Sequence, residues 1–328
     1  MISYLVRRLL LIIPVLLVIS IIAFVVMEAP PGDFVTTYIM RQAEAGAIIW
    51  DEGLEDSLRS VWGLDKPWFI RYLRWIRNIL RGDLGYSLSW RAPVKTIISS
   101  RFLLTMVVAL SATLFVWIVA LPIGVYSATH QYSWSDNVVS LVGFMGLSIP
   151  NFLLALILMY LAHRYLGISI GGLYSQKYLM TGWSLGKFVD LFKHLLAPLI
   201  VIGTAGTAGL IRILRANLLD ELSKSYVELA RAKGLGETRL VMKYPVRIAI
   251  NPFISSIGWV LPGMISGSVI VSVVLGLPTA GPLFLDALRQ QDMMLAGAYI
   301  MLISVFTVVG ILVSDVLLAM VDPRIRYG

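Results

Sequence analysis

The sequence predicts an all-α integral membrane protein with six membrane-spanning helices. Hydrophobic residues make up 58% of its 328 residues and charged residues only 14%, with a mean hydropathy of +0.82. A soluble globular domain is closer to half apolar and a quarter charged, so many of these side chains must face lipid. The apolar residues also fall into six runs of roughly 18 residues or more, the length of a helix that crosses a bilayer.

The net charge of +8 could indicate nucleic-acid binding or membrane topology. Basic residues of membrane proteins gather in cytoplasmic loops, so we favour topology and expect no nucleic-acid partner. The chain has no cysteine, which excludes disulfides, thiolate metal sites and a cysteine nucleophile. Its three histidines, His130, His163 and His194, are scattered, and we predict no metal site.

Residues 1–27 are predicted to form a cytoplasmic N-terminal end and the first span. Arg7 and Arg8 precede an apolar run over residues 9–27. A cleaved secretory signal would have a shorter apolar core, so we expect this helix to be retained.

Residues 28–101 are predicted to form an extracytoplasmic cap region. Amphipathic pieces at residues 54–62 and 68–80 are separated by Gly63, Pro67 and Gly82, which favours a small, mostly helical region on the outer face. The alternative is a loop that only shields the ends of the helices.

Residues 102–328 are predicted to contain the other five spans. We expect these spans at residues 102–128, 137–163, 194–214, 252–275 and 293–320. The third is interrupted at Ser148-Ile149-Pro150, and residues 164–193 and 276–292 are expected to be outer loops. Residues 216–251, between the fourth and fifth spans, form the remaining long loop.

The basic residues predict which side each loop faces. Eight Lys or Arg lie between Arg212 and Ile250, whereas the outer loops 164–193 and 276–292 have four and one. The N-terminal end carries Arg7 and Arg8, and the C-terminal end carries Arg324 and Arg326. Under the positive-inside rule, both termini and the 216–251 loop are cytoplasmic. Arg212 and Arg215 are interpreted as boundary residues at the inner end of the fourth span.

The 216–251 loop is expected to contain a short rigid helix. Ser225 and Glu228 have the spacing of a capping box, which predicts a helix beginning at Tyr226. Gly234 and Gly236 are expected to supply the positive-φ positions that end it. Glu228 could serve as a cap, as an interface residue, or as both. A short rigid helix in the loop between two membrane spans is suited to transmitting force.

No catalytic constellation is present in the sequence. Gly182-Trp183-Ser184-Leu185-Gly186-Lys187 faintly resembles a phosphate-binding loop, but it is one residue short between its glycines and lacks the final Ser or Thr. If the protein uses ATP, another chain must therefore bind it. Asp315 is the clearest charge within a span, and we favour a structural hydrogen bond or a contact near the cytoplasmic loop over a proton relay.

The fifth predicted span is rich in serine and glycine and has two interpretations. Small residues, including the pair Gly263 and Gly267, allow helices to pack closely. Hydroxyl side chains could instead line a pathway for a polar solute. The candidate pathway residues are Ser255, Trp259, Pro262 and Ser266.

The cytoplasmic loop resembles the permease subunits of ABC importers. Glu228, Ala230 and Gly234 match their Glu-Ala-Ala signature and its glycine, Leu229 replaces the first alanine, and Pro252 closes the region. The run Ala230-Arg231-Ala232-Lys233-Gly234-Leu235 resembles the corresponding run in the dipeptide/oligopeptide permease family. Further matching segments are residues 31–33, 63–67, 82–87, 148–152 and 322–326. The long region after the first helix resembles the first of the family's two paired permeases.

This resemblance implies a type I importer permease fold in the inner membrane and a set of partners. These are a second homologous permease subunit, two cytoplasmic ATPase subunits that hold ATP and Mg, and an extracytoplasmic solute-binding protein; this chain would hold no cofactor and would not be an enzyme. The residues expected to contact an ATPase are Tyr226, Glu228, Leu229, Ala230, Arg231, Ala232, Lys233, Gly234 and Leu235.

The resemblance suggests di- or oligopeptides as the solute, with oligosaccharides as the alternative. Arg289-Gln290-Gln291-Asp292 and the long 164–193 loop depart from the usual peptide-family pattern on the side where solute arrives. An ion-coupled secondary carrier is the alternative of another class, and it would need ionisable groups near the bilayer midplane, which are sparse here.

Overall fold

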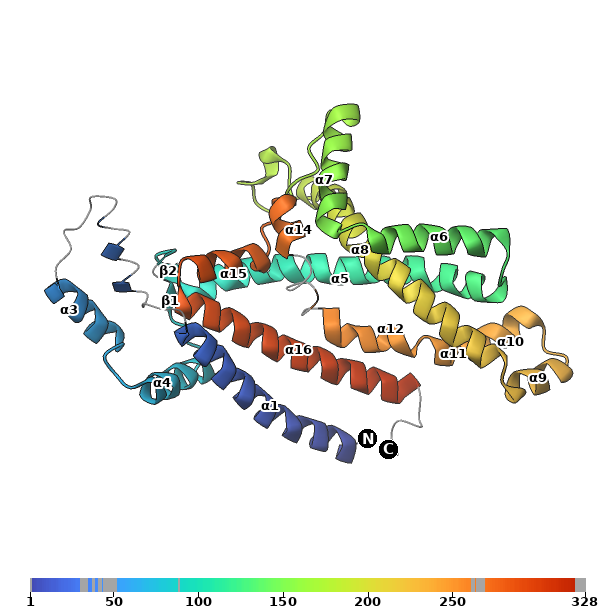
Figure 1. Ribbon diagram of the computed structural model, residues 1–328, viewed down its shortest axis with the longest axis horizontal. Coiled ribbons are helices and arrows are strands. Elements are labelled where there is room, and N and C mark those ends of the chain that lie inside the picture. Colours follow the sequence, from blue (N-terminus) through green and yellow to red (C-terminus); the bar gives the residue numbers. More distant parts are fainter. Residues whose placement is uncertain are drawn as a thin grey trace. The chain divides into compact units, whose positions relative to one another are not determined.

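A computed structural model describes residues 2–29, 35, 36, 39, 40, 43, 52–87, 89–260, 263 and 269–321. Within these residues the protein is almost entirely helical (Figure 1). The chain divides into two compact units. Unit 1 comprises Met1–Leu5, Leu104–Thr279 and Thr307–Gly328, and unit 2 comprises Val6–Leu103 and Ala280–Phe306.

Unit 2 contains most of α1 and the helical part of the predicted cap. Its elements are α1 (Ile2–Glu28), α3 (Glu52–Trp62), α4 (Trp68–Leu80), the antiparallel pair β1 (Tyr86–Ser87) and β2 (Ala92–Pro93), α15 (Ala280–Arg289) and the start of α16 (Met293–Val321). The bounds of α4 agree with the prediction at both ends.

The apolar core of unit 2 joins α4 to α1. Phe24 lies edge-on to Tyr72 with ring centroids 5.5 Å apart, and Trp75 is buried beside them. An ion pair of 2.5 Å between Arg71 and Glu28 links the same helices at their ends. Helix α4 of the cap is therefore packed on the first helix through aromatic burial.

One loop prediction in unit 2 is wrong. Residues 276–292 were expected to be turn-rich, but α15 forms between Ala280 and Arg289. Ala280, Leu283 and Ala287 are buried, which is the spacing of one helix face. Pro282 lies in the first turn, where it costs no hydrogen bond.

Unit 1 contains most of α5 and the helices that follow it. In order these are α5 (Val94–Thr129), α6 (Trp134–Ser148), α7 (Asn151–Leu161) with its π-helical end η1 (Ala162–Leu166), η2 (Gln176–Tyr178), α8 (Leu185–Leu222), α9 (Ser225–Ala232), α10 (Glu237–Lys243), α11 (Pro245–Ala249), α12 (Asn251–Ser256), η3 (Ile257–Trp259) and α14 (Val269–Val274). The C-terminal half of α16 also belongs to this unit.

Among the described residues, four helices are long and apolar enough to cross a membrane. They lie at Arg7–Glu28, Val94–Thr129, Leu185–Leu222 and Met293–Val321. α6 and α7 together would make a fifth; they meet at an angle of 99° at the interruption predicted for residues 148–150. Pro150 precedes α7 and cannot donate the hydrogen bond that would continue α6.

The predicted fifth span appears as α12, η3 and α14, and residues 261, 262 and 264–268 lie outside the described residues.

The longest helix of unit 1, α8, extends beyond its predicted bounds. It begins at Leu185 instead of residue 194, because Ser184 caps it by accepting a hydrogen bond of 3.2 Å from the backbone of Lys187. It packs closely against α5: a Cβ added at Gly203 would lie 2.7 Å from Phe115. A glycine is therefore needed where these two helices meet.

Candidate coupling site

The short helix α9 follows the last turn of α8 almost directly. It begins at Ser225, with Lys224 in the cap position and no capping side chain. The prediction that Ser225 caps this helix is therefore wrong. Instead, Glu221 in the last turn of α8 pairs with Lys224 and accepts a hydrogen bond of 2.6 Å from the hydroxyl of Tyr226. These two contacts hold the start of α9 against α8.

One face of α9 is anchored in a buried apolar cluster. The exposed fraction is 0% for Val227 and 9% for Ala230. They pack with Leu214 and Leu218 of α8 and with Leu240 of α10 in one core. The spacing of three residues places both anchors on the same side of the helix.

The opposite face of α9 is open to solvent. Ser225, Glu228, Leu229 and Ala232 are all exposed, and the exposed fraction of Leu229 is 58%. Their spacing of three, four and seven residues makes a single stripe along the helix. One face of this helix is anchored, and the other exposes a leucine at its centre. Such a rigid helix can dock in a groove of another chain.

The end of α9 is defined by a glycine and by an ion pair. Gly234 has φ +76°, as predicted, which is a conformation that only glycine adopts easily. Gly236 does not: its φ is −61°, and it occupies the cap position of α10. Arg231 donates two hydrogen bonds, of 3.1 and 2.6 Å, to the carboxylate of Glu237. This exposed pair joins α9 to α10 and lowers the pKa of Glu237.

The remaining predicted coupling residues lie beside the stripe. Arg231, Lys233 and Gly234 are exposed, and Leu235 is half-buried against the cluster that holds Val227. The predicted residues are thus brought together on one small helical unit. The sequence reasoning missed Glu221, which lies seven residues before Glu228, the first residue of the matched signature.

A polar groove lies between the C-terminal part of α8 and helices α11 and α12. Its volume is about 670 Å³, and its lining includes Asn217, Asp220, Asn251, Ser255 and Ser256. Ser255, a predicted pathway residue, donates a hydrogen bond of 3.1 Å to the backbone of Asn251. For Trp259 only the main chain is described, in η3, and Pro262 and Ser266 lie outside the described residues.

Close packing accounts for other residues of this segment. A Cβ added at Gly258 would lie 3.0 Å from the side chain of Ile311 in α16. Ser314 of α16 donates a hydrogen bond of 2.9 Å to the backbone of Ile254. One face of α12–η3 therefore packs on a neighbouring helix, while Ser255 faces the groove.

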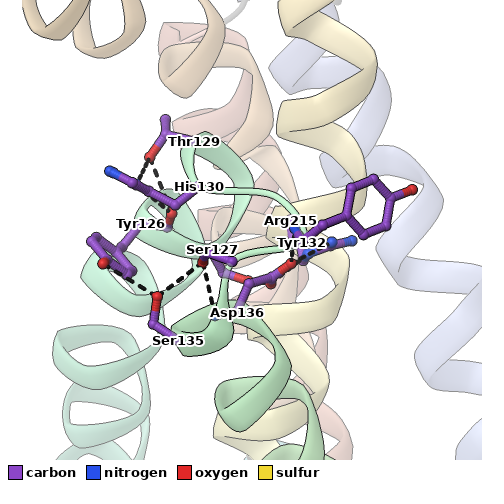
Figure 2. Close-up of polar contacts among 9 residues, drawn as sticks. Tyr126, Ser127, Thr129, His130, Tyr132, Ser135, Asp136 and Arg215 are labelled. Atoms are coloured by element: carbon purple, nitrogen blue, oxygen red, sulfur yellow. Dashed lines mark hydrogen bonds and ion pairs between the residues drawn. The ribbon is translucent and has the colours of Figure 1, made fainter.

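An ion pair between a buried carboxylate at the start of α6 and a partly exposed guanidinium joins α6 to α8 (Figure 2). Arg215 donates hydrogen bonds of 3.0 and 2.8 Å to the two carboxylate oxygens of Asp136. Arg215, predicted as a boundary residue, therefore also has a specific structural partner. The pair was missed because its members are 79 positions apart in the sequence.

The segment that faintly resembles a phosphate-binding loop has a structural role. Lys187 is buried, donates a hydrogen bond of 2.6 Å to the backbone of Thr181, and lies over the ring of Tyr174. Ser184 caps α8. These contacts use the polar groups of the segment to order the loop that precedes α8.

Comparison with known proteins places the chain in a family. A model described as "Binding-protein-dependent transport system inner membrane component" matches residues 120–327. The model for the N-terminal part of such components matches residues 1–111. The chain belongs to this family. It is the permease subunit of an ABC importer, a non-catalytic, multi-pass component of the inner membrane, which confirms the resemblance found at residues 228–252.

The relatives match the chain over its full length. The oligopeptide transport system permease protein AppB of Bacillus subtilis is 37% identical over 100% of both chains. The glutathione transport system permease protein GsiC is 30% identical over 100% of both chains, in Escherichia coli K12 and in Salmonella paratyphi A.

Proposed function

We propose that this permease imports short peptides, with α9 as the helix that receives force from an ATPase subunit. The complete importer contains this chain, a second homologous permease, two cytoplasmic ATPases that hold ATP and Mg, and an extracytoplasmic solute-binding protein. Membership of the binding-protein-dependent family supports the presence of ATPases and a binding protein. The second permease rests on the resemblance to the paired permeases.

The observation that carries the proposal is the two-sided character of α9. Its inner face is fixed by Val227 and Ala230, so a push on the helix is passed to α8 and α10 and is not absorbed by bending. Its outer face presents Leu229, flanked by Glu228 and Ala232, to a partner. An exposed leucine on a rigid helix loses little conformational entropy on docking.

The same proposal includes the membrane topology. We infer six spans, with residues 252–275 forming the fifth as a broken helix and α6–α7 forming the third. Both termini and the 216–251 loop then lie in the cytoplasm, in keeping with their excess of Lys and Arg.

The translocation pathway is proposed to pass along residues 252–275. The polar groove beside Ser255 supports this assignment, because it gives a hydrophilic surface at one end of the segment. Trp259, Pro262 and Ser266 would continue the wall. Since the chain has no cysteine, single cysteines at Ser255 and Ser266 can be tested for labelling by a water-soluble thiol reagent. Protection by transported peptide supports the assignment, and unlabelled positions in an active transporter contradict it.

Peptides are preferred as the solute because both named relatives carry peptides or a peptide-like compound, according to their names. Competition for uptake between a tetrapeptide, glutathione and an oligosaccharide, measured in vesicles with the complete importer, decides this point. Competition by the oligosaccharide alone would contradict the proposal.

The coupling role is tested by changing the exposed stripe without changing its anchors. In the reconstituted importer, Leu229→Glu should lower ATP-driven uptake at least about tenfold, the loss typical of removing a well-packed interface residue. Leu229→Met keeps the apolar contact and is the matched control. Normal uptake by Leu229→Glu would contradict the assignment, as would uptake by the permease without its ATPases.

A further inference from the structure

The first turn of α6 contains a buried carboxylate, that of Asp136, with four hydrogen bonds. The exposed fraction of Asp136 is only 2%. Besides the two bonds from Arg215, it accepts one of 3.0 Å from the backbone of Tyr132 and one from the hydroxyl of Ser127. Figure 2 shows the carboxylate between Ser127 and Arg215. Its hydrogen-bonding capacity is therefore met by α5, the turn and α8 together.

The turn is shaped so that these groups converge on the carboxylate. Tyr132 has φ +61°, an unusual conformation for a residue other than glycine. Ser133 caps α6 by accepting a hydrogen bond of 3.2 Å from the backbone of Asp136. The backbone conformation that directs Tyr132 N–H at the carboxylate is thus fixed locally.

Arg215 lies in the part of α8 that also anchors α9. Its neighbours Leu214 and Leu218 pack in the same buried cluster as Val227 and Ala230 of α9. Ala128, near the end of α5, belongs to this cluster as well. The residues next to Arg215 on α8 and the inner face of α9 therefore share one buried core.

The ion pair differs in kind from the other contacts between α6 and α8. Further along, the two helices meet through small apolar groups, since a Cβ added at Gly146 would lie 2.8 Å from the methyl of Thr204. Apolar contacts of this kind transmit force through close packing, but they are not directional. A guanidinium that holds both oxygens of a carboxylate fixes distance and orientation.

We propose that Asp136 and Arg215 are positioning residues that make the start of α6 move with α8 and α9 during transport. Force received on α9 reaches α8 through the buried cluster, and the ion pair passes it to α6, the first half of the bent pair α6–α7. The proposal rests on the proposed coupling role of α9. It assigns these residues no contact with solute or nucleotide.

The first experiment separates positioning from folding. In the reconstituted importer, Asp136→Asn should lower the peptide transported per ATP hydrolysed by about tenfold, within the usual range of coupling between sites. The double variant Asp136→Asn/Arg215→Gln leaves no unpaired charge, so it should regain the thermal stability of the complex. It should not regain the transport ratio. Recovery of both quantities would show a purely structural role and would overturn the proposal.

The second experiment measures the movement itself. Because the chain has no cysteine, spin labels can be placed at Trp134→Cys on α6 and Met242→Cys on α10, both exposed positions. In the assembled importer the distance between the labels should stay the same with and without trapped ATP. Asp136→Asn should change this distance when ATP is trapped. A change already present with Asp136 and Arg215 intact would overturn the proposal.

Leu229→Glu, measured in parallel, distinguishes the two levels of the argument. If Leu229→Glu leaves transport unchanged, the coupling role of α9 fails. If Leu229→Glu abolishes transport while Asp136→Asn transports normally, α9 keeps its role and the positioning role of the ion pair fails.

Discussion

Two segments of unit 1 are tied to α8 by opposite means. The start of α6 is joined to it by an ion pair with a buried carboxylate, whereas α9 is joined to it mainly by apolar burial, with the polar contacts of Glu221 at its start. The buried pair needs both members, because a single charge left without its partner is costly in a protein interior. The apolar anchor tolerates graded change, and it leaves the outer face of α9 free to vary. The difference separates a joint within the chain from the surface that we propose for an ATPase subunit.

The largest effect is expected at the buried pair. Asp136→Ala leaves the Arg215 guanidinium without its carboxylate and should lower the free energy of unfolding by about 3–5 kcal/mol. The loss can be measured as thermal unfolding in detergent. Asp220→Ala, an exposed carboxylate on the same helix as Arg215, is the control and should change stability little. Equal losses of stability in the two variants would contradict the contrast between the ion pair at Asp136 and the apolar anchor of α9.

The anchor of α9 should give an intermediate effect. Val227→Ala removes two methyl groups from a fully buried position and should cost about 1–3 kcal/mol. Leu229→Ala, on the exposed face of the same helix, should leave unfolding unchanged while lowering transport. If both substitutions altered stability alike, α9 would not have one anchored and one free face.

Substitutions at the C-terminal end of α9 should lower the free energy of unfolding less than substitutions in its buried anchor. Gly234→Ala places a side chain at φ +76°, which costs about 1 kcal/mol, although no atom lies within 4 Å of the added Cβ. Gly236→Ala, at an ordinary negative φ, is the matched comparison and should cost less. Circular dichroism of the thermal transition can rank the two, and the reverse order would contradict the assignment of Gly234 as the terminating residue.

The smallest effect concerns the exposed pair between α9 and α10. Arg231 lowers the pKa of Glu237 below its ordinary value of 4.5. A carboxylate with a lowered folded-state pKa stabilises above its ordinary pKa, and this contribution is lost as the pH falls through the folded-state pKa. The amide protection factors at the α9–α10 junction, which correct for the intrinsic pH dependence of exchange, should therefore fall below about pH 4.5. Glu237→Gln should remove that pH dependence, and a dependence that persists in the variant would assign it to another group.

Local patterns were sufficient for the features that depend on neighbouring residues. The apolar run of α16, the amphipathic pattern of α4 and the glycine at position 234 each act over a few turns of backbone, and all three are found as predicted. The residues that cap and end the helices were predicted less accurately. Ser225 is a helical residue instead of a cap, because Glu221 already holds the start of α9 from the preceding helix.

Composition and local spacing determined that this chain is a helical membrane protein, and the matched signature predicted which short helix would contact an ATPase. Only the tertiary structure decided the 99° bend between α6 and α7, the burial that turns residues 280–289 into a helix, and the pairing of Asp136 with Arg215. Each of these depends on groups that are distant in the sequence. A sequence pattern records which side chains are apolar or charged, but a charge is tolerated in the interior only where the fold brings its partner to it.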